Sequence, residues 1–278
     1  MRLKAHLLVA VLFLSLAIAG RADEVSDKGR DVFNKHRRSV VTVQLVQKMS
    51  GRGGESREMK QDVTGTVVDP SGLTVLALSM VDPTEMYRRM YGDSYKADLE
   101  VSDVKILQDD GAEIAAEIVL RDKDLDLAFI RPKTKLTTPM PAADLTKAAP
   151  VQVLDIVVSL NRLGRAAGRS HAASIERISA VVQKPRTFYI PDSTMTATSS
   201  GSPAYALDGN LVGLFVTRVL SSGGGSASMN NFRPDNVTGI ILPAEDVLKA
   251  AKQAPEAKGE DEKKEEAKPE AKPEAEKK

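Results

Sequence analysis

Few residues in this chain are of the types that catalysis or metal binding needs. Its 278 residues include three histidines, His6, His36 and His171, and no cysteine. The absence of cysteine excludes disulfides, thiolate nucleophiles, iron–sulfur clusters and cysteine-ligated zinc. Three histidines limit acid–base and metal chemistry to very few places, so their positions matter more than their number. We expect no metal site and no cofactor.

The polar segment Ser199-Ser200-Gly201-Ser202 carries hydroxyl groups of the type that nucleophilic catalysis uses. A serine hydroxyl becomes a nucleophile when a neighbouring base takes its proton, and a carboxylate such as Asp126 can orient that base. Taken alone, the serine segment fits an ordinary polar turn between two strands. Asp126 alone fits a hydrogen-bonded carboxylate at the edge of a strand. Their chemistry therefore depends on the elements that position them.

Those elements are predicted to be mainly strands. β-Branched runs of strand length recur between turn signals such as Asp109-Asp110-Gly111. They form two series, about residues 39–135 and 150–243, and Leu136–Ala149 connects them. Helices are expected over Asp23–Arg38 and Ala244–Lys252, and Pro83–Lys96 is expected to be a helix or a loop that packs on the core. Many short strands favour an all-β sandwich or barrel. The predicted strands are Ser39–Gln47, Val63–Val68, Leu73–Leu78, Asp103–Leu107, Glu113–Leu120, Leu127–Arg131, Gln152–Leu160, Ala173–Gln183, Phe188–Ile190, Leu211–Leu220 and Val237–Leu242.

The two ends of the chain lie outside this pattern. Residues 1–22 begin with Arg2 and Lys4, continue with a short apolar run and end in small residues that suit a cleavage site. This order is typical of a secretory signal peptide. The apolar run is shorter than the roughly 20 residues that span a bilayer, so an uncleaved anchor is the less favoured alternative. Residues 252–278 are mainly Lys, Glu, Ala and Pro and are predicted to be a disordered tail, either a solvated spacer or a tether. We expect a secreted or periplasmic protein with no membrane span after cleavage.

The charge balance restricts the class of partner. Lysines and arginines number 39 and acidic residues 38, so the formal net charge is +1. A nucleic-acid binder is normally strongly basic in some region, and this chain is not. The only glycine run, Gly223-Gly224-Gly225, lies in a serine-rich loop, unlike a phosphate-binding loop that opens a helix. These observations argue against nucleic acid as a partner.

Four segments, in order, resemble the protease domain of the HtrA/Deg-type trypsin-like serine proteases. The resemblance covers roughly residues 39–250, with a weaker fifth match at Gly239–Pro243. It implies a double β-barrel with the active site in the cleft between the barrels. The chain shows no counterpart of the PDZ domain that the family usually appends. The four segments are Thr64–Asp82, Val104–Arg131, Gln152–Val182 and Asp192–Leu214.

The resemblance also assigns the site. Ser200 falls on the nucleophile position and Asp126 on the carboxylate that orients the catalytic histidine. The histidine position itself holds Ser79, which cannot act as a base near pH 7. The oxyanion loop is expected at Thr198, Ser199 and Ser200, where Thr198 replaces a glycine of the family and resists the backbone geometry of such a turn.

Three functions follow from this assignment. The first is an exported HtrA-like pseudo-protease that binds peptide or protein. The second is an active serine endopeptidase in which Ser200 uses an unconventional base, with His171 as the strongest substitute because His36 precedes the first strand. The third is a structural envelope protein that acts through its charged tail. The sequence leaves the oligomeric state open.

Overall fold

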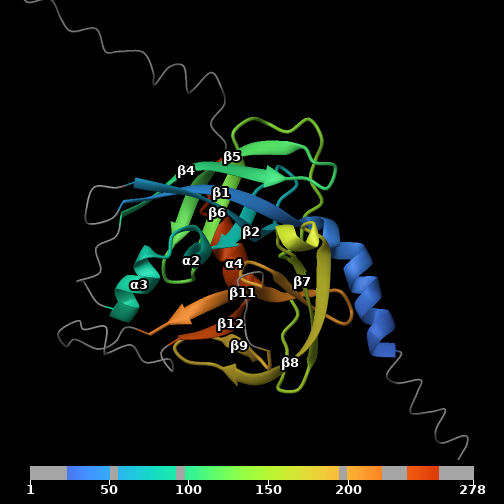
Figure 1. The fold of residues 1–278 in the computed structure, drawn as a ribbon. Helices are drawn as coiled ribbons and strands as arrows, with labels where there is room; N and C mark the ends of the chain where they lie inside the picture. Colours follow the sequence, from blue (N-terminus) through green and yellow to red (C-terminus); the bar gives the residue numbers. More distant parts are fainter. Residues whose placement is uncertain (1–23, 51–55, 92–97, 194–198, 221–236, 257–278) are drawn as a thin grey trace, which may run out of the picture.

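The computed structural model describes residues 24–50, 56–91, 98–193, 199–220 and 237–256. The predicted signal peptide, residues 221–236 and most of the predicted tail lie outside these residues. The chain forms two closed antiparallel barrels of six strands each, which lie side by side (Figure 1). The prediction of an all-β double barrel is therefore confirmed. Among the described residues, no helix is long and apolar enough to cross a membrane.

The first barrel has the strand order β1-β2-β3-β6-β5-β4. Alternating Val, Leu and Ile side chains of its strands fill the interior, and Leu45, Leu76 and Ile106 are fully buried. Its strands are β1 (Val40–Ser50), β2 (Ser56–Val67), β3 (Thr74–Ala77), β4 (Asp98–Leu107), β5 (Glu113–Asp122) and β6 (Leu127–Pro132).

The second barrel has the order β10-β11-β12-β9-β8-β7 and repeats this design. Ile178, Phe215 and Ile241 lie in its buried interior. Its strands are β7 (Ile156–Arg162), β8 (His171–Val182), β9 (Phe188–Pro191), β10 (Pro203–Ala206), β11 (Leu211–Val219) and β12 (Val237–Pro243).

The helical segments lie at the margins of the barrels. A helix over residues 24–36 precedes β1, and its Gly29 approaches β8 closely, since a Cβ atom there would lie 3.7 Å from Ile175. The described part of the chain ends after a helix that packs against β11 and β12. The further helical elements are η1 (Arg37–Ser39), α2 (Leu78–Val81), α3 (Thr84–Tyr91), η2 (Arg165–Ala167) and α4 (Ala244–Ala251).

The two barrels share one apolar cluster. It joins Val75 and Phe129 of the first barrel to Leu160 and Leu214 of the second. Burial of side chains of this size stabilises the fold by about 1.5–3 kcal/mol each. The interface between the barrels is therefore part of the core.

Several elements differ from the sequence prediction, and β4 and β7 differ in their bounds. β10 has the sequence Pro-Ala-Tyr-Ala, which carries no strand signal, and it forms because β7 and β11 pair with it on both sides. Leu78 was expected to end a strand but begins α2. β2 begins at Ser56, well before the predicted Val63, because this polar stretch pairs with β1.

Candidate active site between the barrels

Asp126 and Ser79 meet at the first barrel's side of the cleft. The Ser79 backbone N–H donates to Asp126 Oδ1 at 2.7 Å, and the Ser79 hydroxyl donates to Asp126 Oδ2 at 2.9 Å. α2 presents Ser79, and its first residue donates to the Asp126 carbonyl oxygen at 2.9 Å. Asp126 has φ 57°, a left-handed conformation that Asp tolerates better than most residues. Both carboxylate oxygens of Asp126 therefore accept hydrogen bonds from Ser79.

A third donor to Asp126 comes from the second barrel. The backbone N–H of Thr217 on β11 donates to Asp126 Oδ2 at 2.8 Å. Hydrogen bonds that involve a charged group contribute about 1.5–3 kcal/mol each. Asp126 therefore joins the barrels as well as orienting Ser79. Thr217 could not be predicted from the sequence, because nearly every residue type has a backbone N–H.

The Ser200 turn is held against the first barrel by its neighbour. Gly201 has φ +86°, its N–H donates to the Phe215 carbonyl at 2.8 Å, and its own carbonyl accepts from the Thr66 hydroxyl at 2.8 Å. Ser200 is buried, and its side chain makes no hydrogen bond to another described residue. Sequence reasoning missed Thr66, which lies 135 positions from Gly201. Thr198 lies outside the described residues, so the predicted oxyanion loop is seen only at Ser199 and Ser200.

Both described histidines are engaged away from this site. The His36 ring stacks on Tyr205 with centroids 4.3 Å apart. His171, expected in a loop, begins β8, and its Nε2 lies 3.1 Å from both carboxylate oxygens of Asp109. Burial is the main cause that lowers the pKa of each histidine below 6.5. His6 lies outside the described residues.

A cavity of about 250 Å³ opens beside Asp126 and Ser79. Both barrels line it, and Ser200 is not among its lining residues. Its wall carries both signs of charge, with Asp82 and Lys123 on one side and Arg218 on the other. The same wall includes residues Val216–Val219 of β11. The described residues hold no group of three or more His, Asp or Glu placed to bind a metal ion.

Two antiparallel six-stranded barrels with this cleft define the trypsin-like double-barrel class of protein. The chain belongs to the trypsin-like peptidase domain family, whose sequence model matches residues 63–214, more than half of its length. A sequence comparison with curated proteins gave no match.

Two solved structures share the fold. "HtrA-type protease AlgWS227A with tripeptide" has a TM-score of 0.53 and 15% identity, covering 80% of this chain and 61% of that one. "HtrA-type protease AlgWS227A with decapeptide" has a TM-score of 0.57 and 15% identity, covering 79% and 64%. The chain spans less than two thirds of the length of either structure. The resemblance to HtrA-type trypsin-like domains is confirmed at the level of the fold.

Proposed function

We propose that this protein is an exported, peptide- or protein-binding member of the trypsin-like family that has lost the proteolytic mechanism. The observation that carries the proposal is Ser79, whose hydroxyl donates to Asp126 in the position that the family gives to the base. A serine hydroxyl does not take a proton near neutral pH, so Ser200 has no general base there. Loss of one triad member lowers turnover by about 10⁴–10⁶-fold. Export rests on the signal-peptide pattern of residues 1–22.

A fluorophosphonate probe tests the loss of mechanism. We expect no labelling of Ser200 between about pH 6 and 9, the range in which a histidine or a perturbed lysine base would work. Labelling is measured by intact-protein mass spectrometry, with Ser200→Ala as the matched control and an active trypsin-like protease as the positive control. Labelling that disappears in Ser200→Ala would establish the endopeptidase alternative instead.

Peptide binding is proposed to occur by strand addition to β11. Beyond Leu214, β11 pairs with β12 only, so among the described strands its other edge is open to the cavity. The Phe215 and Thr217 N–H groups point away from β12, because they donate to Ser202 and Asp126. Antiparallel alternation places the Val219 N–H and carbonyl on the same side. Such an edge binds an extended peptide through main-chain hydrogen bonds. The two similar HtrA-type structures contain peptides, which is consistent with this mode.

Proline at position 219 tests the strand-addition mode. Val219→Pro removes the outward N–H, and Val219→Ala keeps it. We expect Val219→Pro to weaken binding of a fluorescein-labelled randomised decapeptide pool about tenfold, the equivalent of one hydrogen bond of roughly 1.4 kcal/mol. Val219→Ala should bind within about twofold of the wild type, since it loses only side-chain contacts. Fluorescence anisotropy measures both. No binding by the wild type, or equal binding by Val219→Pro, would refute strand addition here.

A further inference from the structure

The β7–β8 hairpin reaches across to the first barrel at two polar clusters. In the first, Asp62 on β2 accepts hydrogen bonds from Arg165 at 3.1 and 3.2 Å, from Arg169 at 2.8 Å and from Gln44 at 3.2 Å. Burial alone would raise the pKa of Asp62, but hydrogen bonds from Arg165, Arg169 and Gln44 outweigh it and lower the pKa to about 2. This cluster therefore keeps its charges throughout the physiological pH range.

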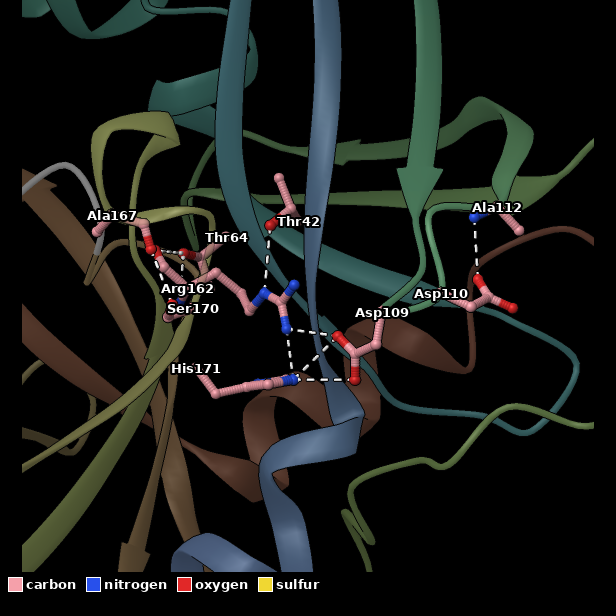
Figure 2. A network of polar contacts seen from close by, with 9 residues as sticks. All are labelled: Thr42, Thr64, Asp109, Asp110, Ala112, Arg162, Ala167, Ser170 and His171. Carbon is pink, nitrogen blue, oxygen red and sulfur yellow. Dashed lines mark hydrogen bonds and ion pairs between the residues drawn. The ribbon is translucent and has the colours of Figure 1, made fainter.

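The second cluster, which we call the Arg162 clasp, consists of Thr42, Asp109, Arg162 and His171 (Figure 2). Arg162 at the end of β7 is only 8% exposed. Its Nη1 donates to Asp109 Oδ1 at 2.7 Å and its Nε donates to the Thr42 hydroxyl at 3.3 Å. His171 Nε2 contacts both Arg162 Nη1 and the Asp109 carboxylate. Arg162 is the buried member of this ion pair, since the Asp109 side chain is 57% exposed, and a buried charge is costly when its partner no longer balances it.

Strand β2 connects the clasp to the Ser200 turn. The Thr64 hydroxyl lies 3.5 Å from both the backbone nitrogen and the backbone oxygen of Arg162. The Thr64 carbonyl packs against Gly201, where an added Cβ atom would lie 2.5 Å from it. Two residues further on, the Thr66 hydroxyl donates to the Gly201 carbonyl at 2.8 Å. Because β2 contacts both residues, a shift of Arg162 relative to β2 would therefore change the position of the Ser200 turn.

His171 is the titratable member of the clasp near neutral pH. Burial lowers its pKa most, Arg162 and Arg37 on η1 lower it further, and Asp109 opposes them. Arg30 on the preceding helix lines the same groove as His171. His171 Nδ1 is buried without a partner among the described residues. Protonation would thus place a second positive charge against Arg162, which donates to the same carboxylate, and would turn the ring nitrogen that faces Arg162 from an acceptor into a donor.

The sign of the resulting pH dependence is fixed by this lowered pKa. The unfolded chain takes up the proton near pH 6.5, and the folded chain takes it up only at lower pH. The contribution of neutral His171 to stability is therefore complete above about pH 6.5 and is lost as the pH falls through the folded-state pKa. Asp62, with a pKa of about 2, does not change its charge in this window.

We propose that the Arg162 clasp is an acid-sensitive link between the barrels, and that protonation of His171 releases it and lets the cleft change its width. In neutral conditions the clasp holds Arg162 against β1 and β2 and keeps the Ser200 turn in place. In acid the clasp opens, while the Asp62 cluster keeps the barrels attached. Weaker peptide binding in acid is a consequence that rests on the proposed function, whereas the opening of the clasp does not.

The test measures the distance between the barrels directly. Because the chain has no cysteine, Arg121→Cys on β5 and Gln183→Cys after β8 place spin labels at two exposed positions, one on each barrel. Double electron–electron resonance spectroscopy should give one narrow distribution of the distance between the labels at pH 7.5. At pH 5 the distribution should be broader and its mean distance longer. His171→Gln, which stays neutral, should remove this shift. His36→Gln, the matched control, should retain it.

A permanent charge at position 171 provides a second test that does not depend on pH. His171→Lys should give at pH 7.5 the distribution that the wild type gives at pH 5. An unchanged wild-type distribution, or the same acid shift in His171→Gln, would overturn the proposal. The decapeptide pool is measured on the same samples. If the distance between the labels increases in acid but the peptide pool does not bind at any pH, the proposed function is refuted and the proposal for the Arg162 clasp is supported.

Discussion

Replacing Gly201 by alanine is expected to lower the free energy of unfolding by about 2–4 kcal/mol. Gly201 has φ +86°, where any other L residue is strained by about 1–2 kcal/mol. An added Cβ atom would also lie 2.5 Å from the Thr64 carbonyl oxygen and 3.2 Å from the Ala77 backbone nitrogen. Both neighbours are backbone atoms of the first barrel and cannot move aside by a change of rotamer. The substitution must therefore push the Ser200 turn away from β2.

Gly111 supplies the matched control for this prediction. It has the same φ of +86°, but no atom lies within 4 Å of the position of its Cβ atom. Gly111→Ala should therefore cost only the backbone strain, about 1 kcal/mol. Urea denaturation followed by circular dichroism measures both variants. Equal losses for the two would show that the close contact between Gly201 and β2 does not form in solution.

The contrast between these glycines shows what the sequence could and could not reveal about the fold. The strand pattern follows from β-branched runs and turn signals, which are local, and most predicted strands overlap the observed ones. β10 is the exception, since Pro203–Ala206 is a strand only because β7 and β11 flank it. The need for glycine at position 201 has the same origin. It depends on strand β2, which lies far away in the sequence.

The candidate site divides in the same way. The spacing around Ser79, together with the family resemblance, predicts that Ser79 and Asp126 stand at the base and carboxylate positions, because these positions are counted from nearby residues. The hydrogen bonds between Ser79 and Asp126 are observed only in the structure. Thr217 and Thr66 were not found, because one acts through its backbone and the other from a strand with no motif. Contacts between the barrels depend on how the halves pack, which no local pattern reports.

Asp126→Ala is expected to lower the free energy of unfolding by about 2–4 kcal/mol, although the proposed function assigns Asp126 no catalytic role. The change removes the acceptor for the Ser79 and Thr217 N–H groups and for the Ser79 hydroxyl. It also places alanine at a φ of 57°. Thermal and urea denaturation measure the loss. Asp126 would then be retained because it ties α2 to β11 across the cleft.

Asp126→Asn separates this structural role from a catalytic one. Asparagine tolerates the left-handed conformation and keeps one oxygen acceptor, so the variant should lose only about 1 kcal/mol. In an active protease, the same change would disturb the orientation of the base and abolish most turnover while the fold remained intact. A stable Asp126→Asn variant that loses a measurable peptidase activity would contradict the structural assignment. If the Asp126 carboxylate only bridges the two barrels, Asp126→Asn must lose less stability than Asp126→Ala. The wild type must then show no peptide hydrolysis.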